Sequence, residues 1–181
     1  MYAGIDYSIS CPAITVGSTD NFEDCKTFYY IKMKKFEGHF GKNIYGMREL
    51  PYEHQMERIN NILQWSMAIL EKFNVSEVCL EGYSFSSNGR AFDIGENTGI
   101  LKHALWKANI RCFVPPPTTV KKYFTGKGNA KKDVMHDSFV EKTCIDLTTV
   151  LPCKNDKNPI SDIVDSYAML CYGIDNHFNN K

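Results

Sequence analysis

The sequence has no surplus of charge of either sign, because its 21 Lys and Arg residues are balanced by 21 Asp and Glu residues. Global charge therefore gives no argument for binding to nucleic acid, and only a local cluster of charge could give one. The chain also lacks an apolar run close to the roughly 18 residues of a membrane-spanning helix, and a basic-then-apolar leader. We therefore expect neither secretion nor insertion into a membrane.

Paired cysteines are missing as well. The seven cysteines are an odd number, no two of them form a C-x-x-C motif, and several lie within apolar stretches. A free cysteine in such a stretch behaves as a small hydrophobic residue. We therefore expect reduced thiols and a cytoplasmic protein.

What the chain does contain is a series of short strands and helices without repeats or linkers. A hydrophobic content of 43% predicts that residues 1–181 form a single globular domain. Strands are predicted at residues 2–6, 13–16, 25–32, 75–81 and 110–114, and helices at 51–73, 90–108, 118–124, 131–144 and 161–174. This order predicts an α/β fold with a mixed five-stranded sheet, in which three antiparallel strands precede two parallel ones and helices cover both faces.

An aspartate ends the first predicted strand. Aspartate is depleted in strands, and a buried carboxylate without a partner is costly enough to shift its pKa and become neutral. Because the first 25 residues contain no Lys or Arg, we expect the positive partner of Asp6 to be a distant side chain or a metal ion. A turn-capping carboxylate that bonds the next backbone amides explains the residue equally well.

Three further acidic residues belong to the same argument. Glu81 ends the fourth predicted strand, and Asp162 and Asp165 share one face at the start of the last helix. An acidic first turn capped by Ser161 is ordinary helix architecture. If all of these acids met Asp6, however, each pair about 4 Å apart would repel by about 4 kcal/mol at an effective dielectric of ~20. Such a cluster predicts divalent cations, and Mg²⁺ suits carboxylate ligands with retained waters.

Local basic clusters are hidden by the zero net charge. One of them consists of Lys121, Lys122, Lys127, Lys131 and Lys132. Such lysines suit phosphate contacts, although a solvated face has the same composition. Residues 33–50 mix basic and aromatic side chains with three glycines and predict a mobile basic loop, which either contacts a phosphate backbone and bases or is simply solvated.

Two glycines interrupt the helix predicted at residues 90–108. Gly95 and Gly99 each cost a helix roughly 1 kcal/mol. We therefore expect another backbone to approach this helix closely.

Five motifs occur in an order that is known from one family. They are Gly4-Ile-Asp6, Leu80-Glu81-Gly-Tyr-Ser-Phe85, Gly95-x-x-x-Gly99, Thr125-Gly-Lys-Gly-Asn-Ala-Lys-Lys-Asp-Val134 and Asp162-x-x-Asp165. In this order they resemble the RuvC-type Holliday junction resolvases of the RNase H-like fold. Tyr7-Ser8 stands where many relatives have Pro-Gly, and the segment 33–50 is longer and more basic than expected. Both departures are similar to viral or bacteriophage members.

The resemblance implies an RNase H-like domain with metal-dependent endodeoxyribonuclease activity on Holliday junctions and other branched DNA. It implies a homodimer in the cytoplasm of a bacterial or virus-infected cell. The implied catalytic and metal-binding residues are Asp6, Glu81, Asp162 and Asp165. They would hold a pair of Mg²⁺ ions, or Mn²⁺ in their place, about 3.5–4 Å apart.

The resemblance also implies which residues contact DNA. Lys132 matches the lysine of the family's glycine-containing segment, and the four other lysines of that cluster would assist it. Either Tyr83 or Phe85 matches the aromatic residue that wedges into the junction, although packing of the loop would explain these rings as well. Two alternatives remain open, namely a catalytically silent nucleic-acid-binding protein of the same fold and a nuclease for RNA in RNA–DNA hybrids.

Overall fold

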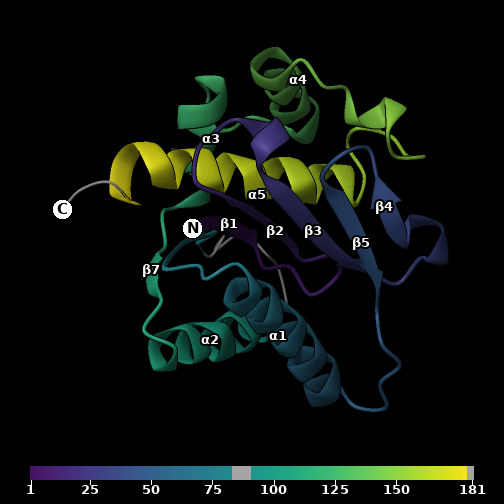
Figure 1. Ribbon diagram of the computed structural model, residues 1–181, viewed down its shortest axis with the longest axis vertical. Coiled ribbons are helices and arrows are strands. Elements are labelled where there is room, and N and C mark those ends of the chain that lie inside the picture. Colours follow the sequence, from purple (N-terminus) through teal and green to yellow (C-terminus); the bar gives the residue numbers. More distant parts are fainter. Residues whose placement is uncertain (83–90, 179–181) are drawn as a thin grey trace.

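The structure is a computed structural model that describes residues 1–82 and 91–178, and the side chains of these residues except at positions 91–94. Within these residues, one mixed sheet has seven strands in the order β4-β5-β3-β2-β1-β6-β7 (Figure 1). The strands are β1 (Tyr2–Asp6), β2 (Ala13–Gly17), β3 (Lys26–Ile31), β4 (Gly38–Phe40), β5 (Ile44–Arg48), β6 (Glu77–Leu80) and β7 (Arg111–Phe113).

The centre of the sheet has the predicted topology. Strands β1, β2 and β3 are antiparallel neighbours, whereas β6 runs parallel to β1 and β7 runs parallel to β6. Ile5 of β1 is paired in register with Leu80 of β6. The next residues along the chain, Asp6 and Glu81, therefore lie side by side at the carboxyl ends of these two strands.

The predicted number of strands was wrong, and so was the mobile loop at residues 33–50. This segment forms β4 and β5, and β5 pairs in parallel with β3 while β4 pairs with β5 in antiparallel fashion. The strands are short, and their buried residues, such as Ile44, are separated by glycines and charged side chains. Charged residues are common in edge strands, where they discourage pairing with other chains, so this strand pair has no alternating apolar signal.

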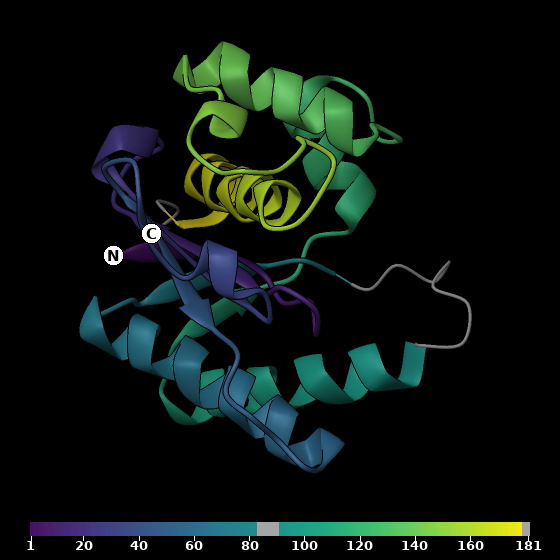
Figure 2. The ribbon, with the colours of Figure 1, turned by 90° about the vertical axis from the view of Figure 1, so that its right-hand side faces the viewer.

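Helices cover both faces of the sheet, as predicted. Helices α1 and α2 lie on one face, and α5 crosses the other with α3 and α4 outside it (Figure 1, Figure 2). The helices are α1 (Gln55–Lys72), α2 (Ala91–Lys107), α3 (Pro117–Thr125), α4 (Lys132–Thr143) and α5 (Ile160–Gly173). Short 3₁₀ turns occur at η1 (Phe22–Asp24), η2 (Lys34–Phe36) and η3 (Leu147–Thr149), and a π turn, η4 (Ile174–Phe178), follows α5. None of the described helices combines the length and apolar character that crossing a membrane requires.

Two hydrophobic clusters, one on each face, fix these layers. On the α5 side, Tyr167 contacts the edges of the Phe22 and Phe139 rings. On the α1 side, Ile62 and Leu70 pack with buried residues of β1 and β6. Both faces of β1 are therefore covered, which explains why its interior is apolar throughout.

Helix α5 lies unusually close to β1. A Cβ atom added at Gly4 would come within 2.1 Å of the Ser166 carbonyl oxygen and 2.2 Å of the Leu170 nitrogen. The Ser166 hydroxyl also forms a buried 2.8 Å hydrogen bond with the hydroxyl of Thr15 on β2. Glycine at position 4 therefore allows α5 to rest directly on the strand that ends at Asp6.

The expectation about Gly95 and Gly99 stays a prediction for a contact with a second chain. An added Cβ atom at either position would meet nothing within 4 Å in the described residues, so no backbone of the described chain approaches α2 there. The expected cap of the last helix was wrong. The N-cap of α5 is Pro159 rather than Ser161. Ser161 lies within the first turn, where its hydroxyl has other partners.

Candidate active site

Four carboxylates from three distant parts of the sequence meet at the carboxyl ends of the neighbouring strands β1 and β6. Asp6 ends β1, and the backbone NH of Glu81 donates to the carbonyl of Ile5 at 3.1 Å, which places Glu81 beside it. Asp162 and Asp165 come from the first half of α5, which the contact at Gly4 places over β1. Asp6 and Asp162 are only 7% and 5% exposed. The structure therefore brings together all four acids that the sequence singles out.

The electrostatics of Asp6 show how close these acids are. Burial raises the pKa of Asp6 well above its ordinary value, and the charges of Asp162, Glu81 and Asp165 raise it further. Of these three acids, Asp162 has the largest effect on the pKa of Asp6. Because ionised carboxylates repel one another at short range, the group favours protonation where no cation is bound.

Nearby lysines partly offset the rise in pKa of the other three acids. Burial raises the pKa of Asp162 and of Glu81 to about 7, and that of Asp165 to about 6. Lys132 opposes the shift at all three, and Lys121 opposes it at Glu81 and Asp165. These two lysines therefore lie against the cluster, while the largest charge effects on Asp6 come from acids.

This donor set fits a divalent cation by its chemistry. The four side chains offer carboxylate oxygens, which Mg²⁺ prefers, and a cation bound among them would relieve their repulsion. Residues 1–82 and 91–178 contain no group of three or more His, Cys, Asp or Glu side chains already arranged to hold a metal ion. Magnesium is commonly held by one or two carboxylates, waters and substrate phosphates rather than by a complete protein cage, so this arrangement is compatible with it.

A hydrogen-bonded group ties α4 to the start of α5. Lys132 Nζ donates to Ser161 Oγ at 3.1 Å, and the Ser161 hydroxyl lies 3.2 Å from Asn158 Oδ1 and 3.3 Å from Asp162 Oδ2. Since the serine has one proton, it donates to one of these oxygens at a time. The lysine, the serine and Asp162 therefore form one connected unit.

Solved structures share this arrangement of elements. A Thermus thermophilus RuvC structure superposes with a TM-score of 0.60 over 95% of this chain and 93% of that one, at 18% sequence identity. The chain has the RuvC fold. A second structure, of T. thermophilus RuvC in complex with Holliday junction substrate, gives the same TM-score at 21% identity over 94% of this chain and 90% of that one.

Proteins that are similar in sequence also carry the name RuvC. Proteins called crossover junction endodeoxyribonuclease RuvC, from Thermotoga petrophila and Thermotoga maritima, are each 32% identical to the chain over 93 and 92 residues. These matches cover 51% and 50% of this chain, and 54% and 53% of the relatives, so the chain spans about half the length of the relatives it matches. No protein-family model matches the chain. The resemblance to RuvC that the motifs indicated is confirmed.

The predicted DNA-contacting residues have different positions on this RuvC fold. Lys121 is half-buried on α3 and Lys132 begins α4, and both lie against the acids. The other three, Lys122, Lys127 and Lys131, are exposed on α3 or in the connection to α4, and no contact with the four acids is seen in the described part of the chain. Tyr83 and Phe85 lie outside the described residues.

One neighbour of the acids was missed by the sequence analysis. Cys11 is buried near Asp162, and burial together with the charges of Asp162 and Asp6 raises the pKa of its thiol strongly. Cys11 follows Asp6 in the turn between β1 and β2. Only its short distance from Asp6 in the sequence could have indicated this position, because a buried cysteine otherwise suggests a core residue.

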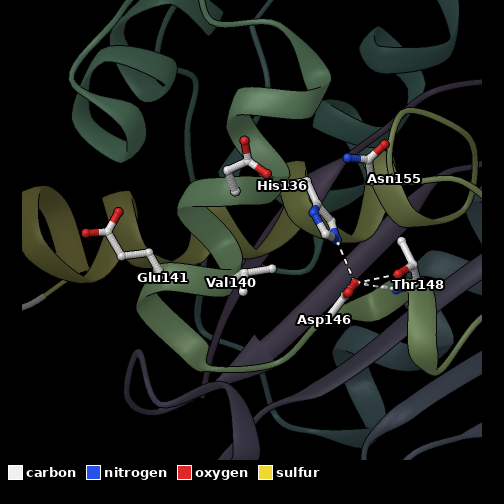
Figure 3. A pocket seen from close by; sticks show the side chains of 7 residues that line it. His136, Val140, Glu141, Asp146, Thr148 and Asn155 are labelled. Atoms are coloured by element: carbon white, nitrogen blue, oxygen red, sulfur yellow. Dashed lines mark hydrogen bonds and ion pairs between the residues drawn. The ribbon is translucent and has the colours of Figure 1, made fainter.

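The RuvC fold also has a pocket that includes none of the four acids. It lies beside α4, has a volume of about 530 Å³ and is lined by acidic side chains around His136 (Figure 3). The buried His136 Nε2 lies 3.5 Å from Asp146 Oδ1 and has no hydrogen-bond partner among the residues that the structure describes. Asp137, Glu141 and Asp146 would repel phosphate groups, so this pocket is unsuited to DNA.

Proposed function

We propose that this chain is a metal-dependent endodeoxyribonuclease that resolves Holliday junctions and other branched DNA by hydrolysing phosphodiester bonds, leaving 5′-phosphate ends. The observation that carries the proposal is the convergence of four carboxylates, in which the strongest charges that act on the buried Asp6 are those of the other three acids. The RuvC fold and relatives named crossover junction endodeoxyribonuclease support the choice of substrate.

In this proposal, Asp6, Glu81, Asp162 and Asp165 hold two Mg²⁺ ions, for which Mn²⁺ can substitute. The chemistry that such bound ions supply is activation of a water molecule and stabilisation of the leaving oxygen. The chain's own part is to hold the acids ionised and oriented. Lys132 does so at Asp162 through its charge and through Ser161, and Lys121 stabilises the ionised forms of Glu81 and Asp165.

We further propose that the active form is a homodimer in a reducing compartment such as the cytoplasm. A dimer can present two active sites to opposed strands of a four-way junction. A reducing compartment agrees with the seven cysteines, all of which are free thiols. Lys122, Lys127 and Lys131 extend the basic surface from Lys121 and Lys132 toward the DNA.

The central experiment compares the wild-type protein with Asp6→Asn on a labelled four-way junction in MgCl₂ or EDTA. We expect Mg²⁺-dependent cleavage by the wild-type protein, and a loss of about 10³-fold or more in Asp6→Asn, equivalent to roughly 4 kcal/mol of transition-state stabilisation. Junction binding in EDTA should persist in the variant. Asp137→Asn removes an exposed carboxylate from α4 and serves as the matched control, which should cut normally.

The choice of substrate separates the remaining alternatives. Binding of the junction by the wild-type protein without any Mg²⁺-dependent cutting would indicate a catalytically silent binding protein. Preferential hydrolysis of the RNA strand in an RNA–DNA hybrid would indicate a ribonuclease. Full cleavage by Asp6→Asn would refute the assignment of the site.

A further inference from the structure

The outer edge of the sheet carries a surface that the proposed site does not use. We define the edge segment as residues 32–48, which contain η2, β4 and β5. It has one acidic residue, Glu37, and five basic ones, so its formal charge is 5 − 1 = +4 in a chain of zero net charge. The basic residues, all exposed, are Lys32, Lys34, Lys35, Lys42 and Arg48.

These charges are largely uncompensated. Lys42 lies 3.2 Å from Glu23, and both side chains are well exposed. In the described part of the chain, Lys32, Lys34 and Arg48 have no carboxylate within ion-pair distance, and Lys35 lies over the Phe36 ring at 4.7 Å. A strand pair whose charges served only solubility would be expected to mix both signs. A cluster of one sign instead favours an anionic partner.

The edge segment is held in place by buried contacts. Phe36 is 1% exposed, and its carbonyl accepts a 2.7 Å hydrogen bond from the hydroxyl of Tyr29 on β3. A Cβ atom at Gly46 would come within 2.0 Å of that same carbonyl oxygen. The Asn43 amide donates to the carbonyls of Phe22 and Cys25. The lysines of η2 therefore stand on a fixed support rather than on a solvated loop.

The edge segment shares a hydrophobic cluster with the start of α5, the helix that carries Asp162. Phe36, Tyr29 and Cys11 belong to one hydrophobic cluster that also contains Ile160 at the start of α5, with Cys153 packed against it. Burial raises the pKa of the Cys153 thiol, on which the Lys35 ammonium and the Asp162 carboxylate act in opposite directions. Lys35 and Asp162 therefore both lie near Cys153, whereas Lys121 acts on Glu81 and Asp165.

We propose that the edge segment is a second DNA-contacting surface, which binds the phosphate backbone of one arm of a branched substrate while the lysines of α3 and α4 bind DNA on the other side of the acids. This inference rests on the proposed function. We expect the edge segment to bind phosphates rather than bases, because its aromatic rings already stack on other rings of the protein. His39 stacks on Tyr45 at 4.5 Å, and Tyr45 stacks on Phe28 at 5.2 Å. Figure 2 shows this edge of the sheet facing the viewer.

The test measures how strongly junction binding depends on salt. Each phosphate contact contributes about 0.9 to the slope of log K against log salt concentration. The variant Lys32→Gln/Lys34→Gln/Lys35→Gln, assayed in EDTA, should reduce the slope by about 2 to 3 and weaken binding of a four-way junction more than that of a linear duplex of one arm's length. Lys72→Gln/Lys107→Gln removes exposed charges from α1 and α2 and should leave the slope nearly unchanged.

The outcomes separate this inference from the proposed function. If the wild-type protein binds and cuts junctions but the triple variant has the same slope and affinity, the edge segment does not contact DNA and the inference is wrong. If the wild-type protein neither binds nor cuts branched DNA, the proposed function itself fails. Arg48→Gln alone should lower the slope by about 1, which gives an independent answer should the triple variant fail to fold.

Discussion

The strongest charges that act on the carboxyl group of Asp6 are those of other carboxyl groups, and together with burial they raise its pKa well above the ordinary value. A buried charge with no compensating partner is costly, so the metal-free protein sacrifices stability at this site. The same feature favours cation binding. At the scale of single residues, protons and metal ions therefore compete for the same acids.

This competition predicts an unusual pH dependence of stability. The pKa of Asp162 rises from 3.8 to about 7 on folding and that of Glu81 from 4.5 to about 7, so the folded state binds more protons than the unfolded state between these values. Stability contributed by such groups is present at low pH and is lost as pH rises toward 7. In EDTA, the free energy of unfolding should fall by on the order of a few kcal/mol between about pH 5 and pH 8.

Denaturant titrations at the two pH values, with EDTA or with millimolar MgCl₂, measure this effect. Magnesium should restore most of the loss at the higher pH, because it binds the ionised acids of the folded state. Asp6→Asn should show a smaller fall in EDTA than the wild-type protein, whereas Asp137→Asn should show the same fall. A metal-free protein whose stability increases over this window would contradict the proposed electrostatics.

At the scale of elements, the contact between β1 and α5 aligns the acids. Gly4 is the position at which the two backbones touch, and Asp6 and Asp165 lie close to it on either element. Gly4→Ala should push α5 away from the sheet and lower the free energy of unfolding by about 3 kcal/mol. Cleavage should fall more than the folded fraction does, because the acids no longer meet.

Urea unfolding and a cleavage assay under fully folded conditions test this prediction together. A control for the unfolding measurement alone, Gly99→Ala, adds the same methyl group where nothing lies within 4 Å in the described residues. This control should be neutral or stabilising by up to roughly 1 kcal/mol, because alanine favours the helix. Equal effects of the two substitutions would show that the close approach at Gly4 does not matter.

The elements differ in how far the sequence predicts them. Central strands such as β1 and the helix α5 carry apolar patterns that fix their type, and their ends place Asp6 and Asp162 correctly. The pair β4 and β5 was missed, because its stability comes from contacts made after folding, such as those of Phe36 and Asn43 with distant carbonyls. Cys11 was missed for a related reason, since the proximity of its thiol to Asp162 depends on how α5 crosses the sheet.

At the scale of the whole molecule, the described part of the chain leaves the outer face of α2 uncovered around Gly95, Gly99 and Trp106. Gly95 and Gly99 leave open space there, and Trp106, further along the helix, is 73% exposed. A large apolar ring beside a flat glycine surface is typical of a surface that meets another protein. Because a two-fold dimer uses the same patch on both subunits, we expect two copies of α2 to pack against each other in the homodimer.

The substitution Trp106→Glu should therefore convert the dimer into monomers, since it places two like charges at the contact. Light scattering at micromolar concentration measures the mass, and a junction assay shows whether cuts on opposed strands remain paired. Met56→Glu changes a residue of α1 that is 51% exposed and should leave the dimer intact. A wild-type protein that is monomeric with and without junction DNA would contradict the expected dimer, while leaving the metal chemistry of each active site as proposed.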